Sequence, residues 1–182
     1  MKRHIMIDNE TFGTRKNAVV VSVGAVAFDL DGTIDLNGGL HYALNIDEQL
    51  AAGRSMNAST LKWWLEQSEL ARVALVKQMD RAVSVSQFMD RFDAFVSYYS
   101  PQVKIWCKGA NFDIALLDSL YEHAGRKRPY GYNATGDTRS FEKFYTLADN
   151  PPDGIYHDAL SDAVWQAQQL QNLCRRMGWT EL

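Results

Sequence analysis

The chain has 182 residues, of which 46% are hydrophobic and 23% are charged, and its formal net charge at pH 7 is −3. This length and apolar content fit one domain over residues 1–182 and exclude a disordered chain. No apolar run approaches the ~20 residues of a membrane span, and the start of the chain lacks the features of a signal peptide. The weakly acidic charge argues against a strong nonspecific nucleic-acid binder, but not against an enzyme whose carboxylates hold cations.

The two cysteines, Cys107 and Cys174, match neither a zinc-ligand spacing nor a disulfide framework. Disulfides form mainly in oxidising compartments. We therefore expect free thiols and a cytoplasmic location.

The start of the chain predicts antiparallel strands. Residues 4–10 form an apolar run, and residues 18–28 are rich in β-branched side chains, which favour strands. Asp31-Gly32 is a tight-turn signal. We therefore expect a returning strand in two pieces, over residues 33–36 and 39–46.

Two predicted helices follow. Residues 59–79 and 84–99 carry apolar side chains at helical spacing. Ser84 and Gln87 have the spacing of a capping box at the start of the second helix.

The second half of the chain alternates strand and helix. Residues 103–107 predict a short strand, and Asn111–Ala124 predict a helix that Asn111 caps and Gly125 ends. Residues 149–154 consist of turn formers and helix breakers and predict a loop. The last helix is expected over residues 158–176. An antiparallel start followed by helices and further strands predicts a mixed α/β domain.

Four carboxylates and one histidine form the candidate site. Asp8 and Glu10 lie two residues apart at the end of the first strand, so they share one face. Asp113 begins a helix, and His157 precedes Asp162 by five residues, which places His157 before the last helix and Asp162 on its second turn. Four oxygen donors suit one or two Mg²⁺ or Mn²⁺ ions, and an imidazole suits a base that activates water. The set predicts metal-dependent hydrolysis of a phosphodiester.

Each of these segments taken alone has a structural explanation. Acidic residues are common at strand ends, and the helix dipole favours Asp113 in a first turn. His157 and Asp162 alone fit a loop-to-helix turn followed by an exposed acid. The functional interpretation depends on all three segments occurring together in this order.

The chain resembles the DEDDh branch of the DnaQ-like 3′–5′ exonucleases, which have a ribonuclease H-like fold. The resemblance is carried by Ile7–Thr14, Asn111–Asp113 and His157–Ala163. Ser59–Leu65 and Trp106–Gly109 are similar to a smaller phage and bacterial branch, although Lys108-Gly109 stands where many relatives carry His-Asn. The resemblance implies a mixed sheet, with antiparallel strands first and parallel strands later, flanked by helices.

The same resemblance implies roles for the candidate residues. Asp8, Glu10, Asp113 and Asp162 would hold two divalent ions, Mg²⁺ or Mn²⁺, and His157 would accept the proton of the attacking water. The substrate would be single-stranded or 3′-overhanging RNA or DNA. The products would be nucleoside 5′-monophosphates released from its 3′ end.

Four further residues are candidate substrate contacts. Thr11 and Phe12 match positions that meet the terminal nucleotide in relatives, with Phe12 stacking on a base. Trp64 and its neighbour Trp63 point about 100° apart on a helix, so either both lie in the core or one faces the substrate. Arg139 is expected either near a phosphate or in a helix cap. Relatives often dimerise, and a homodimer formed through aromatics such as Tyr98 and Tyr99 is left open.

A rival interpretation rests on Asp29 and Asp31. An apolar strand that ends in Asp-x-Asp-Gly-Thr resembles the nucleophile motif of haloacid-dehalogenase-type phosphatases. The alternative is a β-hairpin turn, because Asp-Gly is a strong hairpin signal. A lone short match has an appreciable false-positive rate, and the phosphatase would leave the four carboxylates and His157 without a role. The nuclease is therefore the favoured prediction.

Overall fold

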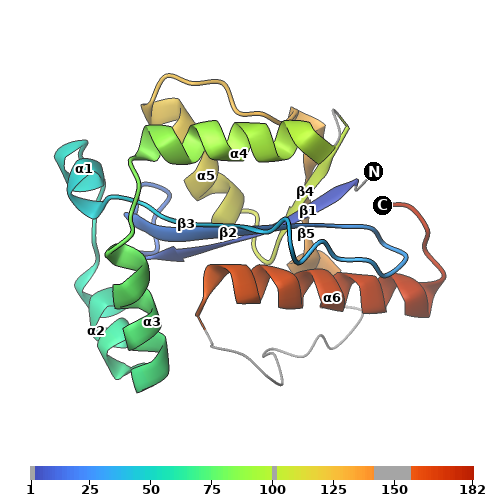
Figure 1. Ribbon diagram of the computed structural model, residues 1–182, viewed down its shortest axis with the longest axis horizontal. Coiled ribbons are helices and arrows are strands. Elements are labelled where there is room, and N and C mark those ends of the chain that lie inside the picture. Colours follow the sequence, from blue (N-terminus) through green and yellow to red (C-terminus); the bar gives the residue numbers. More distant parts are fainter. Residues whose placement is uncertain (1–2, 100–101, 142–156) are drawn as a thin grey trace.

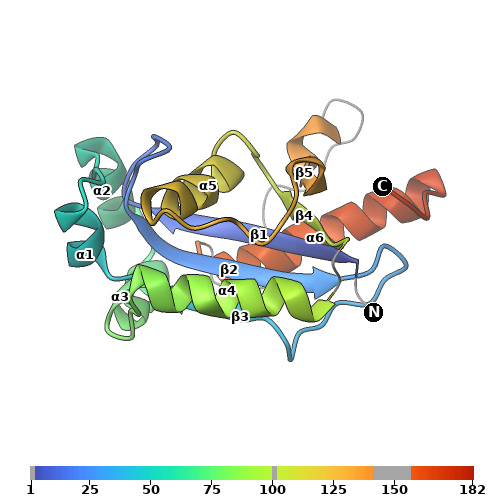
Figure 2. The ribbon, with the colours of Figure 1, turned by 90° about the horizontal axis from the view of Figure 1, so that it is seen from above.

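In the computed structural model, which describes residues 3–99, 102–141 and 157–182, a mixed sheet lies between two layers of helices (Figures 1 and 2). Helices α4 and α5 cover one face of the sheet, and α6 covers the other. The predicted loop over residues 149–154 lies outside the described residues. No helix in the described part of the chain is long and apolar enough to cross a membrane.

The five strands have the order β3-β2-β1-β4-β5. The first three pair in antiparallel fashion, whereas β4 is parallel to β1 and β5 is parallel to β4. The predicted sequence of antiparallel and then parallel strands is confirmed. The strands are β1 His4–Thr11, β2 Val20–Phe28, β3 Leu40–Ala43, β4 Lys104–Cys107 and β5 Thr135–Asp137.

The helices of the described residues form the outer layers. Two short 3₁₀ turns, at Tyr132–Ala134 and Thr138–Phe141, flank β5. The α-helices are α1 Ile46–Ala51, α2 Ala58–Glu66, α3 Glu69–Met79, α4 Val85–Tyr99, α5 Asp113–His123 and α6 Ala159–Met177.

Alternate side chains of β1 enter two different cores. Ile5 and Ile7 pack with residues of α4 and α5, whereas Met6 packs with the apolar face of α6. Because side chains alternate along a strand, Asp8 and Glu10 share the face of Met6, under α6. The apolar pattern of β1 thus sets the face on which the two acids lie.

Two predicted elements end earlier than their patterns suggested. The strand expected over 39–46 stops at Ala43, because Asn45 caps α1 by accepting a hydrogen bond from the Glu48 backbone N–H at 2.9 Å. The piece expected over 33–36 contributes only an isolated bridge between Ile34 and Phe28.

The helix expected over 59–79 is two helices, α2 and α3. The break lies at Gln67-Ser68, where Ser68 caps α3 by accepting from the Ala71 N–H. Local hydrogen bonding by Ser competes with helix continuation. The cap at Ser68 therefore divides the segment, although its apolar periodicity is continuous.

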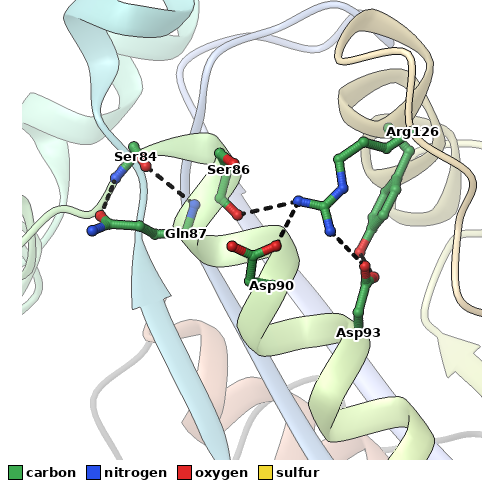
Figure 3. Close-up of polar contacts among 7 residues, drawn as sticks. Ser84, Ser86, Gln87, Asp90, Asp93 and Arg126 are labelled. Carbon is green, nitrogen blue, oxygen red and sulfur yellow. Dashed lines mark hydrogen bonds and ion pairs between the residues drawn. The ribbon is translucent and has the colours of Figure 1, made fainter.

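Predicted caps differ in their outcomes. The capping box of α4 is confirmed, with reciprocal bonds of 3.1 Å between Ser84 and Gln87 (Figure 3). Asn111 does not cap α5: the N-cap is Phe112, which makes no side-chain cap bond. Gly125 ends that helix with φ +62°, as predicted.

Strand β5 was not predicted from the sequence, because Thr-Gly-Asp carries no apolar alternation.

One glycine decides how closely α6 approaches the sheet. Gly24 of β2 is the partner of Asp8 on β1, and a Cβ at Gly24 would lie 2.2 Å from the carbonyl atoms of Ala159. The first turn of α6 therefore lies against bare backbone. This contact places the start of α6 beside Asp8.

We expect Gly24→Ala to lower the free energy of unfolding by roughly 1–3 kcal/mol, since overpacking forces backbone shifts. Urea denaturation provides the measurement. Gly131→Ala is the matched control, because Gly131 has φ −76° and no heavy atom within 4 Å of its would-be Cβ. Equal stability of the two variants would contradict the role of Gly24.

Candidate active site

The end of β1 holds the first two acids. Asp8 is half-buried and Glu10 is buried. Gln166 of α6 donates from Nε2 to Asp8 Oδ1 at 2.7 Å. This bond links the sheet to the second turn of α6 and fixes the direction of the Asp8 carboxylate.

Asp113 reaches the same place from the opposite layer. Its carboxylate Oδ1 accepts from the backbone N–H of Asn9 at 3.3 Å and from Asn9 Nδ2 at 3.2 Å. Asn9 Nδ2 also lies 3.0 Å from the backbone oxygen of Asp113. Asn9 points away from the face of Asp8 and Glu10, and so it ties the start of α5 to β1.

The start of α6 supplies the remaining two residues. Asp158 caps the helix by accepting from the Ser161 N–H at 2.9 Å. His157 lies just before the helix, as expected, with φ +63°, a left-handed backbone that is uncommon for residues other than glycine. Asp162 lies in the first turn of α6, one turn earlier than expected.

The aromatic rings around His157 hold its imidazole. The ring centroid of Trp63 lies 4.6 Å from that of His157, and the centroid of Trp64 lies 5.8 Å away, both edge to face. Trp64 in turn donates from Nε1 to the backbone oxygen of Thr11 at 2.9 Å. The histidine is therefore positioned against α2 and, through Trp64, against the end of β1.

These residues converge on a site that suits a divalent cation. Ligand atoms of Glu10, His157 and Asp162 all lie within 4.8 Å of one another. Asp8 is close enough for the charges of Asp113, Glu10 and Asp162 to raise its pKa. Buried carboxylates at this density need a compensating cation, and oxygen-rich donor sets select Mg²⁺ or Mn²⁺.

Burial raises the pKa of each carboxylate in the site, and nearby acids add to the shift. Burial, followed by repulsion from Asp162, raises the pKa of Glu10 to about 8. The pKa of Asp113 rises to about 7 through burial, although its bonds to Asn9 act in the opposite direction. Burial and repulsion from Asp158 raise that of Asp162 to about 6. Burial lowers the pKa of His157, which keeps its imidazole neutral at neutral pH.

The predicted base-stacking side chains do not lie at the surface. Phe12, with 7% of its surface exposed, and Trp64, with 4%, pack in one small core. Thr11 is also buried and donates to the Gly13 oxygen at 2.7 Å. Trp63 is the exposed member of the tryptophan pair, at 40%.

Arg139 is exposed and lies beside the site. Its Nη2 donates to the Lys108 oxygen at 3.0 Å, and its positive charge lowers the pKa of Asp113. Gly109 has φ +132, and the Arg139 guanidinium fills the space beside it, 3.5 Å from a would-be Cβ. The Lys108-Gly109 departure from the His-Asn of relatives thus coincides with an arginine from another segment.

The rival Asp29 motif lies at the other end of the sheet. His4 pairs with Phe28, so Asp29 follows the end of β2 that is remote from Glu10. Residues 29–33 form a turn closed by a 3.0 Å bond from the Asp29 N–H to the Thr33 oxygen, and the next strand is antiparallel. The hairpin alternative is therefore the one observed.

Sequence reasoning missed two amides, Asn9 and Gln166. Asn9 lies between the two acids of β1, where its alternate face marks it as a partner for another layer. Gln166 follows Asp162 by four residues, the spacing of neighbours on one helix face. Both signals were present in the sequence.

A family model described as the Rv2179c-like 3′–5′ exoribonuclease domain matches residues 3–174. The chain belongs to this family. It is a metal-dependent 3′–5′ exonuclease domain of the DEDDh, ribonuclease H-like type. No curated protein matches the chain.

Solved structures of other nucleases share the fold of this exonuclease. An Escherichia coli exonuclease I–ssDNA complex with zinc aligns at TM-score 0.72 and 13% identity over 98% of this chain and 42% of that one. Schizosaccharomyces pombe Pop2p with Mg²⁺ and Mn²⁺ aligns at TM-score 0.67 and 12% identity, over 100% of this chain and 86% of that one. The nuclease domain of 3′hExo, a DEDDh family member bound to rAMP, aligns at TM-score 0.66 and 13% identity, over 98% of this chain and 94% of that one. The exonuclease spans less than half of exonuclease I.

We expect Asn9→Ala to weaken metal binding, because the Asp113 carboxylate loses an amide donor. Loss of such a supporting bond typically costs about 10–100-fold in metal affinity or activity. The Mg²⁺ concentration for half-maximal activity should rise accordingly. Asn133→Ala, which removes an exposed amide, is the control; an unchanged Mg²⁺ requirement in Asn9→Ala would contradict the prediction.

The metal-free protein should lose stability as pH rises. The folded pKa of Glu10 is about 8, above its ordinary value of 4.5, so its contribution is present below about pH 4.5 and is lost as pH rises through 8. In EDTA, wild-type Tm should therefore fall between pH 5 and 8.5, and less so in Glu10→Gln. Thermal scans of both proteins test this. A steeper fall in Glu10→Gln would refute it.

Proposed function

We propose that residues 1–182 form one exonuclease domain that shortens single-stranded or 3′-overhanging nucleic acid from its 3′ end and releases nucleoside 5′-monophosphates. The observation that carries the proposal is the convergence of Asp8, Glu10, Asp113, Asp162 and His157 at the end of β1. RNA is the proposed preferred substrate, since the matching family is described as exoribonucleases.

The four carboxylates would hold two divalent ions. When bound, such ions stabilise the attacking and the leaving oxygen of a phosphodiester displacement. Burial, followed by repulsion from Asp162 and Asp113, raises the pKa of Glu10 to about 8, and a bound cation would offset this cost of ionising it. Asn9 and Gln166 would keep Asp113 and Asp8 directed at the ions.

His157 would act as the general base. Its lowered pKa keeps the imidazole able to accept a proton, and its ligand atom lies within 4.8 Å of those of Glu10 and Asp162. The indole rings of Trp63 and Trp64 contact the imidazole edge to face and would help to hold it in place. A fixed base contributes about 10²–10⁴-fold to rate.

Trp63 and Arg139 are the proposed substrate contacts. Trp63 offers an exposed ring beside His157, on which a base can stack. Arg139 is exposed beside Asp113 and would pair with a phosphate oxygen. Thr11, Phe12 and Trp64 are buried and would not touch the substrate. They would support the site indirectly, by packing the end of β1 against α2.

The cytoplasmic location and a homodimer stay predictions. Cys107 and Cys174 are buried free thiols, which supports a reducing compartment. Of the two tyrosines expected at an interface, Tyr98 is 75% exposed, whereas Tyr99 is buried and donates to Asp35. Any such interface would therefore use Tyr98 alone of the pair.

The test uses 5′-labelled single-stranded RNA and DNA of one sequence, incubated in Mg²⁺, in Mn²⁺ and in EDTA. We expect a metal-dependent ladder that shortens from the 3′ end, faster for RNA. Asp8→Ala should abolish it, and His157→Ala should slow it by about 10²–10⁴-fold.

Asp29→Asn is the matched control, since this carboxylate lies at the remote end of β2. It should retain wild-type activity. A fully active His157→Ala, or loss of activity in Asp29→Asn with hydrolysis of a small phosphate ester by the wild type, would overturn the proposed site.

A further inference from the structure

A groove follows the outer edge of the sheet. Strand β3 is one of the two edge strands, and residues of β3 line two hollows of about 300 and 350 Å³. Tyr42 and Val83 line both hollows, so the two are adjacent. We call them together the edge groove; its other lining residues are His41, Ala43, Lys77, Gln78 and Arg81 in one hollow, and Gln87, Asp90, Arg91 and Ala94 in the other.

The edge groove is locally basic in an acidic chain. Lys77, Arg81 and Arg91 are exposed and make no ion pair with another described residue. The single acid of the lining, Asp90, accepts from Arg126 at 2.8 Å (Figure 3). Arg126 also pairs with Asp93, so its single charge is shared between two acids. The lining therefore carries three cations and one carboxylate, while the chain as a whole carries −3.

The edge groove begins next to the active site. Gln78 Nε2, in the groove wall, donates to Asp158 Oδ2 at 2.8 Å, and His41 Nε2 lies 3.8 Å from the same oxygen. Asp158 directly follows His157 and caps α6. Its charge also reaches Glu10 and Asp162. One residue therefore separates the groove from the candidate general base.

We propose that the edge groove binds the sugar–phosphate backbone of the substrate strand, upstream of the nucleotide held in the active site. Lys77 and Arg81 would contact phosphates nearest the site, and Arg91 would contact the strand farther along. The inference rests on the proposed function. A nucleic-acid strand is favoured over a peptide, because a peptide added to the edge of β3 would bond to backbone and leave the three cations without partners.

The groove also contains an aromatic ring on which a base could stack. Tyr42 is half-buried at the junction of the two hollows. Aromatic rings inside a positively charged groove are the usual means of holding single strands without sequence preference. The edge groove would therefore favour long substrates over short ones, irrespective of sequence.

The test compares chain lengths. The variant Lys77→Gln/Arg81→Gln is assayed on a 5′-labelled single-stranded 20-mer and on a dinucleotide, over a series of salt concentrations. We expect KM for the 20-mer to rise roughly tenfold at low salt, with the salt slope of log KM shallower by about 1.4, since each single-strand phosphate contact contributes about 0.7. KM and kcat for the dinucleotide, too short to reach the groove, should stay unchanged.

The control variant is Arg175→Gln/Arg176→Gln, which removes two exposed charges at the far end of α6 (Figure 1). It should behave as the wild type on both substrates. Three results would contradict strand binding by the edge groove. They are an equal rise in KM in both variants, an unchanged KM for the 20-mer, and a loss of activity on the dinucleotide that matches the loss on the 20-mer.

A binding measurement separates this inference from the proposed function. Fluorescence anisotropy of a labelled 20-mer in EDTA needs no turnover. Weaker binding by Lys77→Gln/Arg81→Gln than by the wild type supports the groove even if no ladder forms. A ladder from the wild type, together with equal 20-mer binding by the two proteins, overturns the groove and leaves the exonuclease standing.

Discussion

The contact between the first turn of α6 and the bare backbone at Gly24 is the constraint on which the site depends. The would-be Cβ of Gly24 lies 2.2 Å from Ala159, so no larger residue fits without displacing α6. Because Gly24 is the neighbour of Asp8 across the strands, the contact brings Asp162 and His157 over the end of β1. The Gln166 bond to Asp8 then fixes the helix at its second turn.

The acids held together in this way repel one another. Burial raises the pKa of Glu10 to about 8 and that of Asp113 to about 7, and repulsion from Asp162 and Asp113 adds to the shift of Glu10. The donors that hold two of these carboxylates are neutral amides, Asn9 and Gln166, which orient charge without cancelling it. Buried carboxylates that repel one another carry an electrostatic cost that a bound divalent cation would relieve.

The position of His157, the candidate general base, depends on α2. Trp64 is anchored to the Thr11 oxygen, and its neighbour Trp63 lies against His157. The end of β1, the tryptophan pair and the histidine therefore form one connected unit. The bond from Gln78 to Asp158 extends this unit to α3 and to the edge groove, so that the candidate site and the proposed strand path are directly connected.

The sequence by itself determined the chemistry of the site. Apolar alternation in β1 put Asp8 and Glu10 on one face, and the spacing of His157 and Asp162 put the histidine before a helix, because both follow from local periodicity. The same local signals predicted strands β1 and β2, helix α4 with its cap, and the hairpin after Asp29.

Only the tertiary structure decided which layers meet. Apolar periodicity ran through Ser68, where a cap divides two helices, and Thr-Gly-Asp of β5 became a strand only because β4 lies beside it. Trp63 and Trp64 are equivalent in sequence; the bond from Trp64 to Thr11 is what buries one and exposes the other. Contacts such as Gly24 with Ala159 join residues more than a hundred positions apart, and no local pattern encodes them.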